Sequence, residues 1–577
     1  MPFIPPGERT IERKVCRISG QEFFVTDKDM EFYDKISPIF WGKKYSIPSP
    51  TLCPDERQKR RLCFRNERKL YKRKCDFSGK EIISIYSPDK PYVVYDQKVW
   101  WGDDWSPFDY GREFDFERPF FPQFSELMQV TPRLNLFTKQ CENCDYTNHT
   151  LIAKDCYLCV GTTKSESCYY DNFIRDCRDV MDATFCFECE NVYQWVNLTR
   201  CYGCYYAKDS INCRDCLWIE QCENCTHCIG CFWLKNKEYY VYNKSVSREH
   251  YEKTLAAAKN SISFSLFKSF DALKTSYPVK PLQQINCEGC VGDQIENSKN
   301  SFFCFDSQRL ENSKYIYSTP KGIECMDAVY TAPGGVEYCY EVGSTVDVTR
   351  WLFTFYYWNG SGGTYAYGCQ DSDDIFGCSS LKKAQRCVMN TAYSVQEYET
   401  LCGKIIDHMK STGEWWEYFP HEIAHFGYNE TVAQEYFPMT EEKVKEQWWK
   451  WYDGESKNTY IWTYYTPFTI TQYDERVVGY ETATKNINEV LAGIIECELT
   501  NKPFKIIKQE LVFYIENGIP IPTKHPDQRH KERMDLRNPR KLYERNCAEC
   551  KKDMITTYSP ERPEKVVCEE CYKKLVY

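Results

Sequence analysis

Sixteen cysteines between residues 141 and 231 all lie at multiples of three from one another. A period of nine lies beneath this spacing, because nine of the eleven positions reached in steps of nine from Cys141 to Cys231 are cysteine. A helix, with about 3.6 residues per turn, would carry such a stripe off any single face. The ladder therefore predicts a parallel β-solenoid in which nine residues form half a coil and identical columns stack about 4.8 Å apart.

The cysteines of this ladder are interpreted as core packing, because cysteine is a small, apolar side chain that tolerates full burial. A second interpretation is an iron–sulfur cluster, since the run CENCTHCIGC from Cys222 to Cys231 resembles the cysteine run of a bacterial ferredoxin. That pattern has a three-residue gap before its last cysteine and a proline after it. Here the last gap is two residues and Phe232 follows, so packing is favoured.

A second solenoid is predicted over residues 283–393. The motif that begins at Gly230 and ends at Tyr251 recurs 147 residues later, from Gly377 to Tyr398. Aromatic and glycine-rich stretches such as YYWNGSGGTYAYG interrupt the second ladder, and irregular strands are expected there.

Each predicted solenoid ends in a helix, the first over residues 249–260 and the second over residues 395–412. Ser247 and Ser394 stand at the N-cap positions, and Glu397 completes a capping box in the second helix. A terminal helix covers the open edge of stacked coils and protects it from pairing with other chains.

The two ends of the chain are copies of each other. Residues 32–88 resemble residues 513–560, and from Pro48, which pairs with Pro520, the alignment runs without a gap at an offset of 472. The predicted segments are a degenerate zinc-ribbon-like domain (1–136), the first solenoid (137–246), a capping helix and linker (247–282), the second solenoid (283–393), a capping helix and aromatic-rich linker (394–490), and a zinc-ribbon domain (491–577).

The predicted fold class is mainly β. It consists of two tandem parallel β-solenoids of the nonapeptide type, with capping helices, flanked by the duplicated zinc-ribbon-like ends. At 577 residues the chain is too long for a single core.

The C-terminal copy carries two CxxC pairs separated by seventeen residues. Two such knuckles place four thiolates around one Zn²⁺ and leave no open coordination position, as in a structural zinc site. Four buried thiols without metal are the alternative, but they do not account for the paired spacing. The predicted zinc ligands are Cys547, Cys550, Cys568 and Cys571.

The corresponding positions elsewhere in the two ends have lost ligands, so metal binding is not expected there. The equivalent set in the N-terminal copy is Cys75, Ser78, Asp96 and Val99. A further degraded set in each end consists of Cys16, Ser19, Cys53 and Glu56 in front and Cys497, Thr500, His525 and Gln528 behind.

Charge is distributed unevenly along the chain, whose net charge is −9. Residues 1–80 hold 19 Lys and Arg against 11 Asp and Glu, and residues 501–577 hold 17 against 12. Basic ends on an acidic body suggest that the ends would meet any polyanion. The densest basic run could bind along a nucleic-acid backbone. The alternatives are that the run is an ordinary solvated helix face or that it binds an acidic protein. The run comprises Arg57, Lys59, Arg60, Arg61, Arg65, Arg68, Lys69, Lys72, Arg73 and Lys74.

Residues 421–425, HEIAH, match the HExxH motif of zinc proteases. That motif needs a helix so that both histidines share one face, but Pro420 precedes it and Phe426-Gly427 follow at once. The match is interpreted as coincidental, and no other nucleophile, phosphate-binding or paired-acid motif indicates an enzyme.

No apolar run approaches the roughly 20 residues needed to cross a bilayer, and the N-terminus lacks an apolar signal core. A soluble, cytoplasmic protein is expected, with its 34 cysteines reduced or bound to metal.

The chain resembles a cysteine-rich zinc-ribbon and β-solenoid repeat family of candidate-phylum bacteria. The resemblance rests on TLCPDERQKRRLCFRNERKLYKRKCDFSGKEIISIYSPDKP, YGREFDFERPFF, GCFWLKNKEYYVYNK and FGYNETVAQEYFP. It implies zinc binding and a repeat body, and it implies that the N-terminal site has lost cysteines at Ser19, Glu56, Ser78 and Val99. It carries no activity.

The function expected from the sequence is that of a non-enzymatic, zinc-binding scaffold that engages RNA, DNA or a nucleoprotein through its basic ends. The first alternative is a protein–protein interaction scaffold without nucleic acid. A lesser alternative is a zinc metalloenzyme that uses His421 and His425. No membrane partner is expected.

Overall fold

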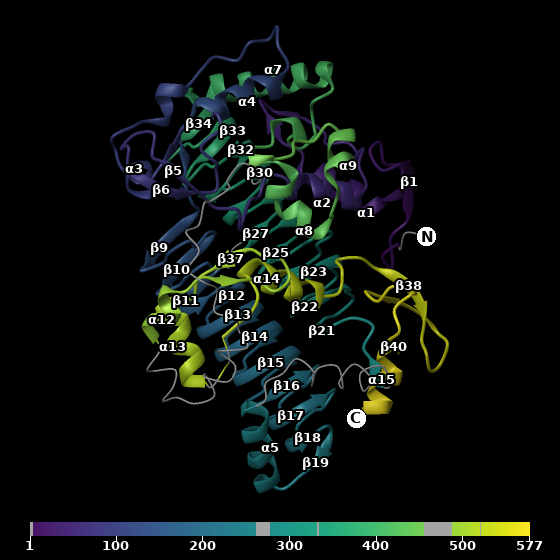
Figure 1. Cartoon of the computed structure of the whole chain (residues 1–577). Coiled ribbons are helices and arrows are strands. Elements are labelled where there is room, and N and C mark those ends of the chain that lie inside the picture. Colours follow the sequence, from purple (N-terminus) through teal and green to yellow (C-terminus); the bar gives the residue numbers. More distant parts are fainter. Residues whose placement is uncertain are drawn as a thin grey trace. The chain divides into compact units, whose positions relative to one another are not determined.

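The computed structural model describes residues 4–260, 277–331, 334–454, 487–517, 519 and 521–576 (Figure 1). The chain forms two compact units, each assembled from two separate stretches. Unit 1 consists of Met1–Leu136 and Leu282–Glu455, and unit 2 of Phe137–Pro281 and Ser456–Tyr577. Each unit therefore joins one solenoid to the chain end that is not its nearest neighbour in sequence. Parts of the two expected segments of capping helix and linker (247–282 and 394–490), namely residues 261–276 and 455–486, lie outside the described residues.

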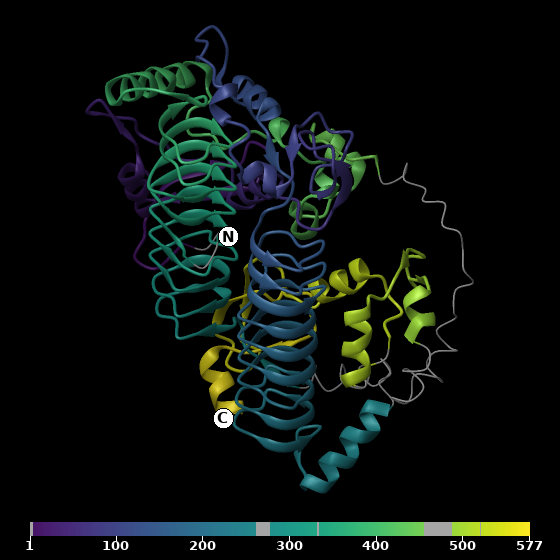
Figure 2. The same cartoon turned by 90° about the vertical axis from the view of Figure 1, so that its left-hand side faces the viewer.

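The first solenoid, in unit 2, is a stack of coils whose parallel strands pair at an offset of twelve residues (Figure 2). Arg178 faces Glu190, and Glu190 faces Tyr202. The strands are β9 (Thr138–Glu142), β10 (Thr150–Lys154), β11 (Thr163–Tyr169), β12 (Asn172–Arg175), β13 (Arg178–Phe187), β14 (Glu190–Thr199), β15 (Tyr202–Ile211), β16 (Leu217–Glu220), β17 (Thr226–Phe232), β18 (Glu238–Val241) and β19 (Lys244–Ser245).

The parallel β-solenoid is confirmed, but the predicted coil of two nine-residue halves is wrong, because one full coil takes twelve residues. Nine and twelve are both multiples of three, so every third residue still points inward. Residues nine apart are diagonal neighbours in successive coils. The thiol of Cys159, for example, donates to the carbonyl oxygen of Cys168 at 3.1 Å.

Corners of the coil are built from residues in the left-handed region, one position before each inward residue. Asp182, Phe185 and Glu188 have φ values of 56°, 57° and 55°, a conformation that few non-glycine residues adopt. A corner at every third residue gives a coil with four short sides. Corner side chains point outward, where Asn212 Nδ2 donates to Asn224 Oδ1 of the next coil at 2.9 Å.

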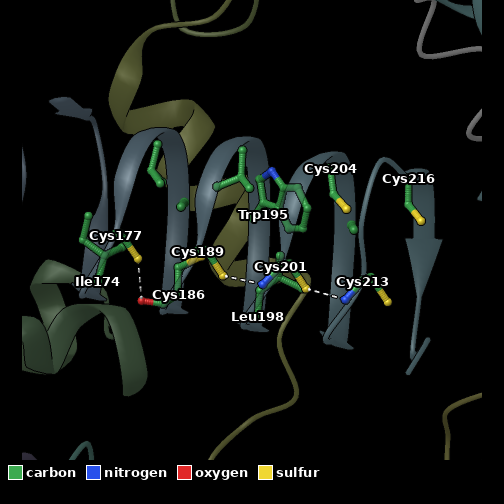
Figure 3. Close-up of a cluster of buried hydrophobic side chains, with 14 of the residues drawn as sticks. Ile174, Cys177, Cys186, Cys189, Trp195, Leu198, Cys201, Cys204, Cys213 and Cys216 are labelled. Carbon is green, nitrogen blue, oxygen red and sulfur yellow. Dashed lines mark hydrogen bonds between the residues drawn. The ribbon is translucent and has the colours of Figure 1, made fainter. Parts of the chain in front are cut away.

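The core of the first solenoid is a column of buried thiols and aliphatic side chains with Trp195 inside it (Figure 3). Most of these thiols are also hydrogen-bond donors: Cys177 Sγ, for example, donates to the carbonyl oxygen of Arg175 at 3.3 Å. Serine takes the same role where it replaces cysteine, since Ser210 Oγ donates to the carbonyl oxygen of Lys208 at 2.9 Å. The thiols therefore act as packing groups with local hydrogen bonds.

The second solenoid, in unit 1, repeats this architecture with two register changes. Val291 pairs with Phe302 at an offset of eleven, and Met326 pairs with Tyr340 at fourteen. Its strands are β21 (Gln284–Ile285), β22 (Val291–Glu296), β23 (Phe302–Gln308), β24 (Leu310–Glu311), β25 (Gly322–Ile323), β26 (Met326–Val329), β27 (Val336–Glu337), β28 (Tyr340–Gly343), β29 (Val346–Thr349), β30 (Trp351–Phe355), β31 (Trp358–Gly360), β32 (Gly363–Tyr367), β33 (Asp373–Ser379), β34 (Gln385–Val388) and β35 (Thr391–Ala392).

The aromatic and glycine-rich stretch of the second solenoid is regular, contrary to expectation. Trp351 pairs with Gly363 and Thr354 with Ala366, again twelve residues apart. Large rings replace thiols inside this part of the coil, where Trp351 and Tyr357 contact each other with centroids 4.0 Å apart. The cysteine ladder stops there because aromatic side chains fill the same volume.

Both solenoids end in the predicted capping helices, α5 (Arg248–Asn260) and α7 (Val395–Thr412). Ser394 Oγ accepts from the backbone N–H of Glu397, and the Glu397 carboxylate accepts from the backbone N–H of Ser394, which confirms the capping box. An antiparallel hairpin precedes each helix, β18–β19 and β34–β35.

The N-terminal end and the stretch after α7 complete unit 1. They contain β1 (Thr10–Val15), β2 (Glu22–Thr26), α1 (Asp27–Ile36), β3 (Ile39–Phe40), β4 (Lys43–Lys44), α2 (Pro54–Leu62), β5 (Tyr71–Lys74), β6 (Glu81–Ser84), β7 (Val94–Tyr95), α3 (Gln97–Trp101), η1 (Pro107–Tyr110), α4 (Phe120–Val130), β8 (Arg133–Leu134), η2 (His421–Ile423), η3 (Tyr428–Glu430), α8 (Val432–Tyr436) and α9 (Glu441–Glu446).

The C-terminal end completes unit 2 and has the same hairpin as the N-terminal end. Tyr543 pairs with Thr556 as Tyr71 pairs with Ser84, at the sequence offset of 472. Its elements, with the strand that joins it to the first solenoid, are β20 (Pro278–Val279), α12 (Ile487–Ala492), β36 (Ile495–Glu496), β37 (Pro503–Phe504), α13 (Lys508–Asn517), α14 (Pro526–Asp535), β38 (Tyr543–Asn546), β39 (Asp553–Thr556), β40 (Lys565–Val566) and α15 (Glu569–Val576). Among the described residues, no helix has both the length and the apolar character that a membrane crossing requires.

Candidate metal centre and docking faces of the two ends

The four predicted zinc ligands come together at the C-terminal end. Cys547 and Cys550 lie in the turn between β38 and β39, Cys568 lies just before α15, and Cys571 lies in its first turn. The four sulfur atoms lie within 4.8 Å of one another. This is the single group of three or more close metal-ligating side chains found among the described residues.

The geometry of this cluster fits a tetrahedral ion. Four sulfurs about 2.3 Å from a central Zn²⁺ would lie about 3.8 Å apart, and Cys550 Sγ and Cys568 Sγ are 3.7 Å apart. The backbone N–H of Cys568 donates to Cys547 Sγ at 3.2 Å, as expected for an outer-shell bond that orients a ligand.

Electrostatics also favour a thiolate at Cys547. Burial by itself raises the pKa of this thiol, but hydrogen bonds from the backbone amides of Cys568, Cys550 and Glu549 outweigh burial and lower the pKa to about 6. A metal at this position would be held by four sulfurs and would tie the hairpin to α15. Its role would be structural, since a closed four-cysteine set leaves no open position for a substrate.

In the N-terminal copy, hydrogen bonds connect the residues at the positions that correspond to the four cysteines. Cys75 Sγ accepts from the backbone N–H groups of Ser78 and Asp96, both at 3.4 Å. Ser78 Oγ donates to Asp96 Oδ2 at 3.1 Å, and Asp96 caps α3 through the backbone N–H groups of Lys98 and Val99. A hydroxyl–carboxylate pair therefore bridges the two knuckles.

The second degraded set of each end likewise shows local contacts. In the N-terminal end, Ser19 Oγ and Cys53 Sγ are 3.6 Å apart, and Cys16 is buried beside them. In the C-terminal end, His525 Nδ1 accepts from the backbone N–H of Asp527 at the start of α14. His525 thus acts as a helix cap.

The HEIAH segment lacks the helix that a zinc protease needs. Its first three residues form the short 3-10 helix η2, and the chain turns extended at Ala424. His421 stacks on Trp449 with centroids 4.8 Å apart, whereas His425 is buried against Tyr367 at 4.5 Å. The two imidazoles therefore lie in different packing environments.

Most of the predicted nucleic-acid run is inside unit 1. Six of its ten cations are buried, namely Arg57, Lys59, Arg60, Arg61, Arg65 and Arg73. Arg68 and Lys69 are partly buried, and Lys72 and Lys74 on β5 are exposed. The exposed part of the run is thus two lysines.

The buried arginines hold α2 against the second solenoid. Arg57 Nε and Arg61 Nη2 bond the two oxygens of Asp327 at 2.9 and 3.0 Å. Asp327 and Arg61 have no solvent exposure. Burial lowers the pKa of Arg57, but the charge of Asp327 outweighs burial and raises it well above the ordinary value.

Further contacts belong to this docking face of unit 1. The guanidinium of Arg57 lies over the ring of Tyr315, 5.1 Å from its centroid. Tyr33 of α1 meets Tyr340 of the solenoid edge-on, with centroids 5.1 Å apart. Glu341 of the solenoid also forms ion pairs with α2, with Arg60 at 2.8 Å and with Arg61 at 3.0 Å. Buried ion pairs, a cation–π contact and a tyrosine pair therefore fix the N-terminal end to its solenoid.

Unit 2 contains the same docking face, built from the duplicated residues. Arg529 and Arg533 of α14 each bond one oxygen of Asp182, the latter at 2.7 Å. Arg529 lies over Tyr170 at 4.6 Å, and Tyr514 of α13 meets the solenoid ring of Tyr193 at 5.8 Å. Every member has a counterpart in unit 1, so duplication preserved the contact and not only the sequence.

Sequence reasoning missed the acidic half of this contact. Asp182 and Asp327 are both corner residues, with φ values of 56° and 54°, and they stand at equivalent coils 145 residues apart. The available signal was the acidic balance of the middle of the chain, which complements the basic ends. The sequence matches no protein-family model, and neither curated proteins nor solved structures give a match.

Proposed function

We propose that this chain is a non-enzymatic binding scaffold in which each solenoid is held rigid by a docked zinc-ribbon-derived end, with zinc in the C-terminal site. The observation that carries the proposal is the duplicated docking face, because a buried, hydrogen-bonded clamp fixes each end and leaves the outer coil faces for partners. The proposal includes the interpretation that the HExxH match of residues 421–425 is coincidental. It also includes a cytoplasmic location, because cores built on thiols need a compartment that keeps cysteine reduced.

Elemental analysis tests the zinc assignment. We expect one Zn²⁺ per chain in protein purified without chelator, and less than about a tenth of that in Cys547→Ser, because three thiolates cannot close a structural tetrahedron. His421→Ala is the matched control and should keep the full metal content. Equal zinc in wild type and Cys547→Ser, or its loss from His421→Ala, would contradict the assignment.

A protein partner is favoured over a nucleic acid. The described structure places most of the basic run in internal ion pairs, where its charges already have counter-ions. Nucleic-acid binding stays a prediction, and the cations of this run that could serve it are chiefly the exposed Lys72 and Lys74.

The salt dependence of nucleic-acid binding distinguishes the two partners. Each phosphate neutralised contributes about −0.9 to the slope of log K against log salt, so two exposed lysines predict a slope no steeper than about −1.8 for duplex DNA. Lys72→Glu with Lys74→Glu should abolish the remaining binding. A slope of about −5 or steeper would require further cations, either the buried arginines or exposed lysines of the C-terminal end such as Lys531 and Lys573, and would favour a nucleic-acid function.

A further inference from the structure

The first coil of each solenoid carries a pair of cysteines whose side chains reach solvent. The pairs are Cys141 with Cys144 in the first solenoid and Cys287 with Cys290 in the second, and all four are partly exposed. Every other cysteine of the two solenoid cores is buried. Solvent access is therefore specific to this coil.

The two pairs occupy equivalent places in the fold. They stand 146 residues apart, each in a CxxC tetrapeptide next to the first strand of its solenoid, β9 or β21. Both strands are the outermost members of their sheets. A hairpin and a helix follow the last coil of each stack, so the thiols lie at the other end, which we call the mouth of the solenoid.

One cysteine motif occurs at two places in the first solenoid, so the effect of its position on solvent exposure can be compared. The tetrapeptide CENC occurs twice in the first solenoid, at Cys141–Cys144 and at Cys222–Cys225. The second copy lies inside the stack, between β16 and β17, where its thiols are 1% and 0% exposed. The same four residues are thus core packing in one coil and an accessible dithiol in the other.

The two thiols of each mouth interact. A hydrogen bond from Cys290 lowers the pKa of Cys287 to about 7, and one from Cys144 lowers the pKa of Cys141. The first cysteine of each pair is therefore the one that more readily becomes a thiolate, and its partner stabilises that charge.

The number of thiol ligands in each pair limits which kind of metal ion can bind. Among the described residues, neither pair belongs to a set of three or more mutually close metal ligands, whereas Zn²⁺ sites in proteins use three or four side chains. Two soft sulfur ligands suit a soft monovalent ion, for which thiolates select Cu(I).

We propose that each solenoid mouth is a two-thiolate binding site for a soft monovalent cation of the Cu(I) class. Binding breaks two S–H bonds and forms two S–Cu bonds, and both protons pass to solvent. Copper stays in the +1 state throughout, so no oxidant or reductant takes part.

A competition titration tests the proposal on the full-length, zinc-loaded, reduced protein. Cu(I) is supplied anaerobically as its bicinchoninate complex, and the loss of the complex's colour measures transfer to the protein. We expect two Cu(I) per chain with zinc retained. Cys141→Ser with Cys144→Ser should leave one, Cys287→Ser with Cys290→Ser should leave one, and the four changes together should leave none.

The matched control is Cys222→Ser with Cys225→Ser, which changes the same tetrapeptide in the buried coil and should still bind two Cu(I). Serine is suitable because Ser210 already occupies an inward position with its hydroxyl bonded. An unchanged capacity in the fourfold variant would overturn the proposal, as would copper uptake matched by zinc release, which would place the copper at the C-terminal cluster.

Native alkylation gives a second measurement that does not depend on a variant's folding. Iodoacetamide followed by peptide mass analysis should label the four mouth cysteines at least ten times faster than Cys222 and Cys225. Labelling of Cys287 should accelerate as the pH rises through about 7, because the thiolate is the nucleophile. Equal labelling rates in both coils would contradict an accessible mouth.

Discussion

Asp327→Asn is expected to lower the free energy of unfolding of unit 1 by about 3–5 kcal/mol, because it removes the carboxylate that pairs with the buried guanidinium of Arg57. Arg57 would then be left in an interior where Asp327 has no solvent exposure, whereas Arg61 would keep its second ion pair, with Glu341 at 3.0 Å. Asparagine is the chosen replacement because it keeps the side-chain volume and adopts the left-handed conformation of this corner. Urea denaturation followed by tryptophan fluorescence and circular dichroism measures the effect.

Asp182→Asn should produce a loss of similar size in unit 2, because it removes the carboxylate that pairs with Arg533 and one of the two that pair with Arg529, whose other partner is Glu510 at 3.5 Å. The matched control is Glu31→Gln, which breaks an exposed ion pair with Lys28 and should change stability by less than about 0.5 kcal/mol. Losses below about 1 kcal/mol at both aspartates would mean that the arginines find water or other partners, and the clamp would not hold the ends.

Insertion of twelve residues should be tolerated where insertion of nine is not. Duplicating residues 226–237 adds one whole coil before the cap, so the strands of the extended stack keep their twelve-residue register. Duplicating residues 229–237 keeps every third residue inward but turns the hairpin and α5 by one side of the coil. That rotation removes the parallel pairing of β18 with β17 and exposes the end of the core.

Thermal unfolding of unit 2 measures this difference. The twelve-residue variant should melt cooperatively within a few degrees of wild type, and the nine-residue variant should lose about 10 °C or more, as expected for a loss of a few kcal/mol in a domain of this size. Soluble expression and strand content by circular dichroism serve as controls for folding. If the nine-residue variant were more stable than the twelve-residue variant, the result would support a coil of two nine-residue halves.

Local features of this fold were predictable from sequence. The inward direction of Cys159, Cys186 and Cys204 follows from their spacing. The four cysteines of the candidate metal centre are recognisable from their two CxxC pairs. Coil length was not predictable, because cysteines nine apart are true spatial neighbours across a diagonal and therefore repeat as regularly as a stacked column would. Only backbone pairing distinguishes the two.

Long-range features were not predictable for a different reason. The basic run around Arg57 and Arg61 has the composition of a nucleic-acid surface or a solvated helix, and a charge pattern does not reveal a partner some 270 residues away in the same chain. Asp182 and Asp327 carry no local motif, since many corner residues are acidic. Their role is visible only in the fold, where Asp182 pairs with arginines of α14 and Asp327 with arginines of α2.

The interleaving of the two units has a consequence for synthesis on the ribosome. Unit 1 needs residues up to Glu455 and unit 2 needs residues beyond Ser456, so neither can be finished while the first solenoid is leaving the exit tunnel. The first solenoid must wait with an uncovered tyrosine-rich face and an unneutralised Asp182 until α14 is translated, whereas α2 is made before the second solenoid and must wait for Asp327. Translation that pauses before residue 526, where α14 begins, should therefore release chains that chaperones retain.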